Sequence, residues 1–507
     1  MDAPTAYARL KTRFGRLSHL GDATEMLHWD LSTVMPPGGA EARAAQLATL
    51  RALGHDLLTA PEVGDLLDAA ETGEAAALDP WDRANLAEMR RAWRHATALT
   101  GDLVEAHSRA CSACEMTWRA ARAADDFAAV KGPLRTVLDL TREIAAAKAE
   151  SLGRTPYDAL LDEYEPDAAA AEITAVFDDL AADLPGLLDD ALAAQARDEG
   201  GAAPAPPPGP VPAARQRALA ARLMTALGFD FRHGRLDESL HPFCGGVPDD
   251  VRITTRYDEA DFTGAVMGVL HETGHALYER GLPAAWRDQP VGRALGMAVH
   301  ESQSLLMEMQ ACRSRAFLSF AAPLMAEMLN GGPGPGWDAE TLYRLYTRVR
   351  PGLIRVDADE VTYPAHIILR FRLERALLSG DLALDDLPGA WRDGMQDLLG
   401  VTVPDDRSGC LQDIHWYDGA FGYFPTYTLG AMTAAQLFRA AVAAVPSIPD
   451  DLARGDMGGL LGWLRTHVHG LGRSVSAREM LVRATGAPLD AAVFKAHLRQ
   501  RYIERAG

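Results

Sequence analysis

Two histidines and a glutamate stand close together in the middle of the chain, in the segment His271-Glu272-Thr273-Gly274-His275. Residues four apart lie on one face of an α-helix, so His271 and His275 can direct their imidazole nitrogens at the same metal ion. Zn²⁺ held by two histidines and one carboxylate keeps a position for water, and Glu272 can accept the proton of that water. The H-E-x-x-H pattern therefore predicts a hydrolytic zinc site.

The third metal ligand has to come from another part of the chain. Tyr278 and Gly281 stand where a longer form of the motif would carry glycine and histidine, so that form is excluded. A carboxylate on a following helix is the other common solution, and His300-Glu301-Ser302-Gln303 opens such a helix. We take Glu301 as the ligand, with Glu308 two turns further on as the alternative.

The histidines need a helix to hold them, and the surrounding residues predict one. The apolar run 261–270 precedes them, and Gly281 is placed as a C-terminal helix stop. Gly264, Gly268 and Gly274 lie inside this helix, where each glycine costs about 1 kcal/mol relative to alanine. They indicate that another backbone or a substrate approaches the helix closely.

Most of the rest of the chain is predicted to be helical. Segments rich in Ala, Leu, Arg and Glu carry apolar residues at spacings of three and four, and they cover residues 39–55, 80–125, 134–152, 170–197 and 213–227. Strand signals are sparse, and the best one covers residues 251–257, just before the metal helix. The edge of this strand could bind an extended peptide, and a purely structural strand is the alternative.

The 507 residues, of which 48% are hydrophobic, can bury a sizeable core. The stretch Gly200–Pro212 is too rich in proline for a helix, but the helical pattern resumes unchanged after it, so it is interpreted as a surface loop. We therefore predict a mainly α protein, a large helical body with a deep active-site cleft, in which a short β-strand or small sheet lies beside the metal helix. It forms one domain over residues 1–507, with a helical part at about 1–197, the loop at about 198–213 and a metal-site part at about 214–507.

The charge and the cysteines limit the class of protein further. Fifty basic and 70 acidic residues give a formal net charge of −20, which argues against binding to nucleic acid or an anionic membrane. Residues 1–20 lack the apolar core of an export signal, and no apolar run is long enough to span a membrane. A cytoplasmic protein with reduced thiols is expected, because the cysteines are few, odd in number and scattered: Cys111, Cys114, Cys244, Cys312 and Cys410.

Several motifs, in order along nearly the whole chain, resemble those of the carboxypeptidase Taq family of zinc metallocarboxypeptidases. They are His241-Pro242-Phe243, Asp250-Val251-Arg252-Ile253-Thr254, the H-E-x-x-H segment, His300-Glu301-Ser302-Gln303, Ile354-Arg355-Val356-Asp357-Ala358-Asp359 and Gly409-Cys410-Leu411-Gln412-Asp413-Ile414-His415-Trp416. Two further runs, residues 29–38 and 157–166, are also similar to the family.

The resemblance implies a helical, cleft-bearing fold, usually a homodimer, that releases single residues from the C-terminus of peptides. Specificity is expected to be broad, with C-terminal proline a poor substrate, and the metal is expected to be zinc, for which cobalt often substitutes. By this resemblance the metal ligands are His271, His275 and Glu301, and Glu272 is the general base.

Further polar residues of these motifs suggest supporting roles. Asp250 and Asp413 are candidates for carboxylates that orient a ligand imidazole, with a surface cap or a salt bridge as the alternative for each. His415 and one of Tyr423 and Tyr427 are candidates to donate hydrogen bonds to the oxyanion of the tetrahedral intermediate.

An exopeptidase must recognise the free carboxylate at the end of its substrate. Arg348, Arg350 and Arg355 supply three guanidinium groups within eight residues, and a guanidinium pairs with a carboxylate through two hydrogen bonds. Pro351 and Gly352 break the helix there and can turn these side chains into a cleft. Arg350 is our first choice and Arg355 our second, while a solvated basic turn paired with the nearby acidic residues is the alternative.

Two other functions are compatible with the same motif. One is a zinc oligopeptidase or endopeptidase, which cuts internal bonds, and the other is a scaffold that has lost its activity. The intact Glu272 argues against the scaffold, because metal binding alone does not require it.

Overall fold

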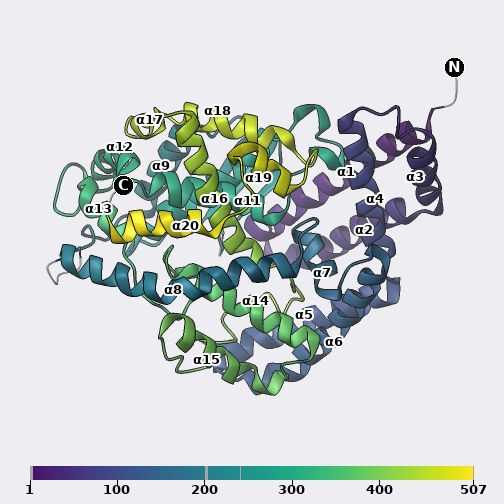
Figure 1. Ribbon diagram of the computed structural model, residues 1–507, viewed down its shortest axis with the longest axis horizontal. Helices are drawn as coiled ribbons and strands as arrows, with labels where there is room; N and C mark the ends of the chain where they lie inside the picture. The colour runs from purple at the N-terminus through teal and green to yellow at the C-terminus, as the bar shows by residue number, and fades with distance from the viewer. Residues whose placement is uncertain (1–3, 200–203, 240, 506–507) are drawn as a thin grey trace.

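The structure is a computed structural model that describes residues 4–199, 204–239 and 241–505. Helices form most of it, and one small sheet lies among them (Figure 1). The first ten helices are α1 (Ala6–Thr33), α2 (Ala40–Thr59), α3 (Pro61–Gly73), α4 (Pro80–Thr97), α5 (Gly101–Ala124), α6 (Phe127–Leu152), α7 (Pro156–Tyr164), α8 (Ala170–Glu199), α9 (Ala213–Ala226) and α10 (Phe262–Gly281). The others are α11 (Met297–Leu305), α12 (Arg315–Met325), α13 (Ala339–Tyr346), α14 (Tyr363–Ser379), α15 (Leu387–Leu399), α16 (Pro425–Ala444), α17 (Ile448–Leu452), α18 (Gly458–His467), α19 (Ala477–Thr485) and α20 (Ala491–Leu498).

The predicted helical segments correspond to helices of the structure. The segment 80–125 contains two of them, α4 and α5. Thr100 is the N-cap of α5, because its hydroxyl accepts a hydrogen bond from the backbone N–H of Leu103 at 3.4 Å.

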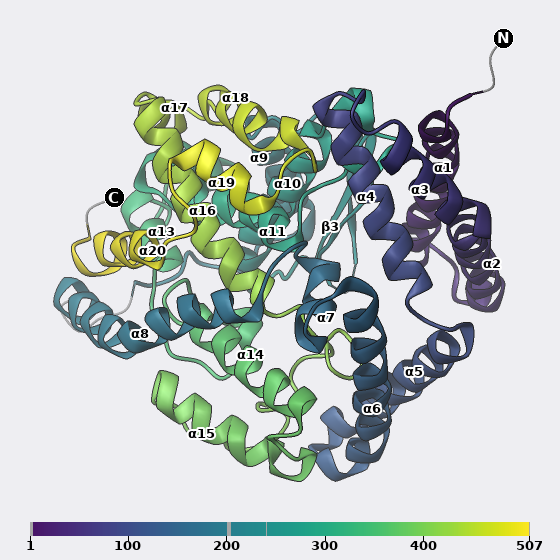
Figure 2. The same ribbon diagram turned by 45° about the vertical axis from the view of Figure 1, so that its right-hand side comes forward.

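The predicted strand is the centre of a three-stranded sheet, β1 (Gly234–Glu238), β2 (Cys244–Val247) and β3 (Asp250–Thr255), in the order β1-β3-β2. β3 pairs with β1 in parallel and with β2 in antiparallel orientation. Both edges of β3 are therefore occupied, so the expectation that this strand offers its edge to a peptide is wrong. In Figure 2, β3 lies between α10 and the N-terminal helices.

The main hydrophobic core surrounds the helices that carry the predicted metal ligands. It includes buried residues of α10, α11 and α16, and α11 packs along α16. A smaller core joins α1, α3 and α4 through residues such as Leu10, Phe14 and Leu67. The metal helix is thus held in the middle of the packed body, where its position is well defined.

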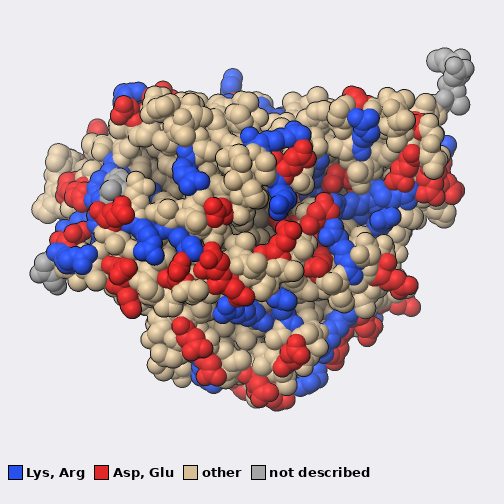
Figure 3. Space-filling view, in the orientation of Figure 1, with Lys and Arg blue, Asp and Glu red and all other residues tan. Residues whose placement is uncertain are grey.

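The remaining sequence features have the expected environments where they are described. Residues 204–212 form no helix and are mostly exposed, while residues 200–203 of the proline-rich stretch lie outside the described residues. All five cysteines are free thiols. Among the described residues, no helix is long and apolar enough to cross a membrane. Acidic and basic side chains are interspersed over the face drawn in Figure 3, with no single large basic patch on that face.

Candidate metal centre

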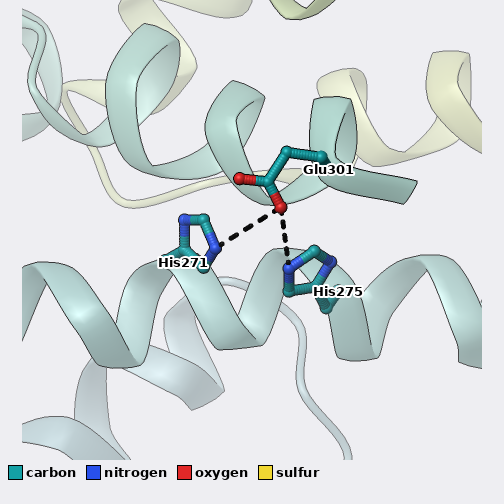
Figure 4. A group of neighbouring side chains, drawn as sticks. All are labelled: His271, His275 and Glu301. Atoms are coloured by element: carbon teal, nitrogen blue, oxygen red, sulfur yellow. Dashed lines mark ion pairs between the residues drawn. The ribbon is translucent and has the colours of Figure 1, made fainter. Parts of the chain in front are cut away.

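Two helices bring the predicted ligands together. His271 and His275 project from α10 toward Glu301 of α11 (Figure 4). Oε2 of Glu301 lies 3.9 Å from Nε2 of His271 and 3.4 Å from Nε2 of His275. One ligand atom from each residue lies within 4.8 Å of the others, and the side chains remain 12–20% exposed, so the group is reachable from solvent.

The second nitrogen of each imidazole has its own partner. Nδ1 of His271 lies 2.9 Å from Oε2 of Glu308, and Nδ1 of His275 lies 3.1 Å from the backbone oxygen of His300. These acceptors place a proton on Nδ1 and leave Nε2 as the metal-binding atom. Glu308, the alternative third ligand, therefore lies where it can orient the His271 ring through Nδ1.

A π-helical segment, Leu306–Cys312, follows α11 and carries Glu308. Short π-helical turns often occur at functional sites because they shift side chains out of α-helical register. The other carboxylate oxygen of Glu308 accepts from Arg313, which is half-buried. Burial would raise the pKa of Glu308, but Arg313 and His271 lower it overall, so this carboxyl group is ionised.

Small residues let the helices approach one another here. A Cβ atom on Gly274 would lie 2.5 Å from the backbone oxygen of Gln303 in α11, and one on Gly430 of α16 would lie 2.8 Å from Cβ of Glu301. The expectation of a close backbone approach is met at Gly274. At Gly264 and Gly268 nothing lies within 4 Å of such an atom, so these two glycines contact no other backbone.

The charges of the site are strongly coupled. Burial raises the pKa of Glu272 to about 7. Burial would lower the pKa of His271, but Glu301 and Glu308 raise it to about 10. Burial is the main reason that the pKa of His275 is lowered, to about 4.

The donor atoms of His271, His275 and Glu301 suit a metal ion. Two imidazole nitrogens and one carboxylate oxygen within 4.8 Å of one another are a donor set that binds Zn²⁺, so these residues fit a zinc ion.

Asp413 has a different neighbourhood from the one expected. Its Oδ1 accepts from Nε of Arg355 at 2.9 Å, and its Oδ2 accepts from Nε of Arg370 at 2.7 Å. Asp413 therefore orients two buried arginines instead of a ligand imidazole. Asp250 pairs with Arg252, its neighbour on β3, at 2.5 Å. Because the ligand imidazoles have other partners, these contacts match the alternative salt-bridge role of both aspartates and not the orientation of a ligand imidazole.

The candidate oxyanion donors lie together near Glu301. Nε2 of His415 is 3.2 Å from the hydroxyl of Tyr427, and the rings of Tyr423 and Tyr427 lie 5.3 Å apart. Burial lowers the pKa of His415 to about 3, so its imidazole is neutral. Burial raises the pKa of Tyr427 to about 12, and nearby Glu301 contributes to this shift.

The three arginines of the predicted carboxylate site do not lie in similar environments. Arg355 is buried, pairs with Asp413, and its guanidinium lies 4.9 Å from the centre of the Tyr427 ring. Arg350 is exposed and donates from its backbone N–H to Asp359 at 2.8 Å, and Arg348 is half-buried. Arg355 is therefore the arginine that the fold brings to the tyrosines of the site.

Three residues of the site were not identified from the sequence in these roles. From the sequence, Glu308 was considered only as a ligand, and Arg370 and Tyr363 were not considered. In the structure, burial and nearby Glu301 raise the pKa of the Tyr363 hydroxyl. Arg370 and Tyr363 lie on α14 outside the H-E-x-x-H pattern, so no spacing rule connects them to the metal helix.

Comparison with known proteins gives a consistent result over the full length. A family model described as carboxypeptidase Taq (M32) metallopeptidase matches residues 9–502. Thermostable carboxypeptidase 1 of Thermus thermophilus is 38% identical, with 100% of both chains covered. Carboxypeptidase 1 of Bacillus subtilis is 31% identical, with 96% of both covered.

Solved structures show the same architecture. Metallocarboxypeptidase 1 of Trypanosoma cruzi has a TM-score of 0.95 at 39% identity, covering 98% of this chain and 99% of that one. The M32 carboxypeptidase of Deinococcus radiodurans has a TM-score of 0.91 at 37% identity, with the same coverage. The mainly helical fold expected from the sequence is confirmed.

Proposed function

This chain belongs to the carboxypeptidase Taq (M32) metallopeptidase family and is a metallocarboxypeptidase, and we propose that it uses zinc to release single residues from peptide C-termini. The observation that supports this most directly is the meeting of His271, His275 and Glu301 at the interface of α10 and α11. Broad specificity, with poor cleavage before a C-terminal proline, belongs to the same proposal and rests on the resemblance to the family.

Glu272 is the proposed general base. When bound, zinc would polarise a water molecule and the carbonyl of the last peptide bond. Glu272 accepts a proton from the attacking water and then passes it to the leaving amine. Its position next to His271, beside the proposed metal ligands, supports this role.

His415 and the neighbouring tyrosines are the proposed donors to the developing oxyanion. A neutral imidazole and a protonated phenol can each donate a hydrogen bond without bringing a charge of their own. The contact between His415 and Tyr427 supports their action as a pair, with Tyr423 beside them. Either tyrosine can serve as the second donor.

The free carboxylate of the substrate is proposed to pair with Arg355. Asp413 holds Arg355 through Nε and Nη2, and the guanidinium has further N–H groups that can donate to a substrate carboxylate. Asp413 lies between Arg355 and Arg370, so the three groups together carry one unbalanced positive charge. Arg350, the first choice from the sequence, is exposed, and its contact with the substrate carboxylate remains a prediction.

Mass spectrometry of one peptide digest tests the function. The proposal predicts a ladder of products that lose single C-terminal residues, and a stall at a peptide that ends in proline. Internal fragments would contradict it and would favour the zinc oligopeptidase. The reaction should stop with a chelator and resume with zinc or with cobalt, and the metal content of the purified protein, measured by elemental analysis, identifies the bound metal.

We further propose a homodimer in the cytoplasm, as the family resemblance implies. The free thiols of all five cysteines are compatible with a reducing compartment. Light scattering during size-exclusion chromatography should give twice the mass of the 54.6 kDa chain. A monomeric mass would contradict the dimer and leave the catalytic proposal unaffected.

A further inference from the structure

A cavity of about 500 Å³ lies against the C-terminal end of the metal helix. Its walls come from residues 228–233 after α9, from Val251 of β3, from the last turn of α10, from residues 282–287 and from α18. The residues that line it do not include the predicted metal ligands, so it is separate from the site described above.

Three arginines line this cavity, and they share few acidic partners. Arg280 donates to Oδ1 of Asp249 at 2.9 Å, and Arg287 donates to the same oxygen. The Nε atom of Arg287 is buried and has no hydrogen-bond partner among the described residues. Arg465 of α18 is exposed, and no hydrogen bond or ion pair of its side chain is found in the described part of the chain.

The local charge is opposite to that of the whole protein. Asp249 can balance only one of the three arginines, and Asp230, the acidic residue in the wall, is already paired with Arg232 at 2.8 Å. The cavity therefore holds an excess of positive charge in a chain of net charge −20. Such a concentration of guanidinium groups in a concave site favours an anion.

Beside these charged groups and His233, the wall has an apolar part. It contains Phe229, Val251, Leu277 and Leu282, all of them buried. A cavity of this volume is in the range that holds small organic molecules and is larger than a bare inorganic anion needs. The ligand must then have both a charged head and an apolar part.

We propose that this cavity binds a small organic anion, whose carboxylate or phosphate head pairs with Arg287 and Arg465. The donors that Asp249 leaves unsatisfied supply the hydrogen bonds, and the apolar part of the ligand lies against Phe229 and Leu277. Because Leu277 and Arg280 belong to α10, a bound anion would contact the last turn of the helix that carries the two histidines.

Calorimetric titration of the full-length zinc-loaded enzyme tests this site. The probes are phenylphosphate, benzoate and inorganic phosphate, and the tighter of the first two identifies the head group. Arg465→Ala should weaken binding by at least about tenfold, because a charge-assisted hydrogen bond is lost. Arg287→Ala should do the same, and Arg465→Ala is the safer variant since its side chain is exposed.

Arg478→Ala is the matched control, because this arginine is 68% exposed and lies outside the cavity. It removes the same charge and should leave the dissociation constant unchanged. Equal binding by the parent, Arg465→Ala and Arg287→Ala would place the anion elsewhere, for example on the zinc, and would overturn the proposal. So would an absence of binding at millimolar concentration, or equal affinity for phenylphosphate and inorganic phosphate.

Discussion

At the scale of single residues, the metal centre combines three proposed ligands with groups that fix their orientation. His271 is held by Glu308 on one nitrogen and faces Glu301 with the other. His275 is held by a backbone oxygen in the same way. Ligands oriented in this manner bind metal more tightly, because less freedom is lost on binding.

Glu272→Gln tests the general base. The amide cannot accept the proton of the attacking water, so turnover should fall by at least ~10²–10⁴, while the metal is retained. Zinc content and peptide cleavage are measured on the same sample. Near-full activity at stoichiometric zinc would show that another group is the base.

Glu301→Ala and Glu308→Ala separate a ligand from a group that only orients one. Loss of Glu308 should weaken zinc affinity by about 10–100-fold, since His271 loses its partner. Loss of Glu301 removes a ligand atom and should weaken it considerably more. A competition titration with a chelator reports both affinities, and an unchanged affinity for Glu301→Ala would exclude it as a ligand.

At the scale of secondary structure elements, the site depends on how closely α10 and α11 pack. Gly274 lets the backbone of α11 approach α10, and Glu165 accepts the backbone N–H of Ala298 at 2.9 Å at the start of α11. Glu165 itself is buried. Changes at these positions therefore act on the ligands through the helices that carry them.

Gly274→Ala should destabilise the fold by roughly 1–3 kcal/mol, because its methyl group collides with the backbone of Gln303. Gly268→Ala is the control: it lies in the same helix with nothing within 4 Å, so alanine should stabilise by about 0.5–1 kcal/mol. Chemical denaturation measures both. Equal effects of the two substitutions would mean that the close approach of α11 does not matter.

Glu165→Gln should alter the pH dependence of stability. Burial raises the pKa of Glu165 from 4.5 to about 7 in the folded protein. Between these values the native state binds the proton more tightly than the unfolded state, so this group makes stability fall as pH rises, by up to about 3 kcal/mol. Glutamine, which still accepts from Ala298, should remove this fall. The free energy of unfolding is measured for both proteins at a series of pH values. The same pH dependence in both proteins would contradict the raised pKa of Glu165.

At the scale of the whole molecule, residues far apart in the chain form the proposed substrate site. Arg355, Asp413 and Tyr427 come from different segments and meet around the C-terminal half of the core. The family match from residue 9 to residue 502 agrees with one catalytic unit, although the predicted single domain remains a prediction.

Amidated and free-acid peptides test whether this site reads the substrate carboxylate. The parent enzyme should cleave the free acid far better, and Arg355→Ala should lower its kcat/KM by about 10–150-fold, as expected from the loss of a hydrogen bond to a charged group. The same variant should narrow the difference between the two peptides, whereas Arg350→Ala should have the smaller effect. Comparable kcat/KM for both peptides with the parent enzyme would contradict recognition of the carboxylate.

The sequence by itself predicted the features that depend on residues close to one another in the chain. Four-residue spacing puts His271 and His275 on one helical face wherever that helix lies, and periodic apolar residues predict long helices. The choice of Glu301 over Glu308 as the third ligand also came from the sequence and agrees with the resemblance to the family, and the structure brings Glu301 to the two histidines.

Only the tertiary structure decided which distant groups meet. Glu308, in the π-helical segment, contacts His271, and Asp413 pairs with Arg355 and with Arg370 of α14. β3 became a central strand because β1 and β2 pair with it, although their own sequences give weak strand signals. Such contacts depend on packing across the whole core, which local spacing and propensity do not specify.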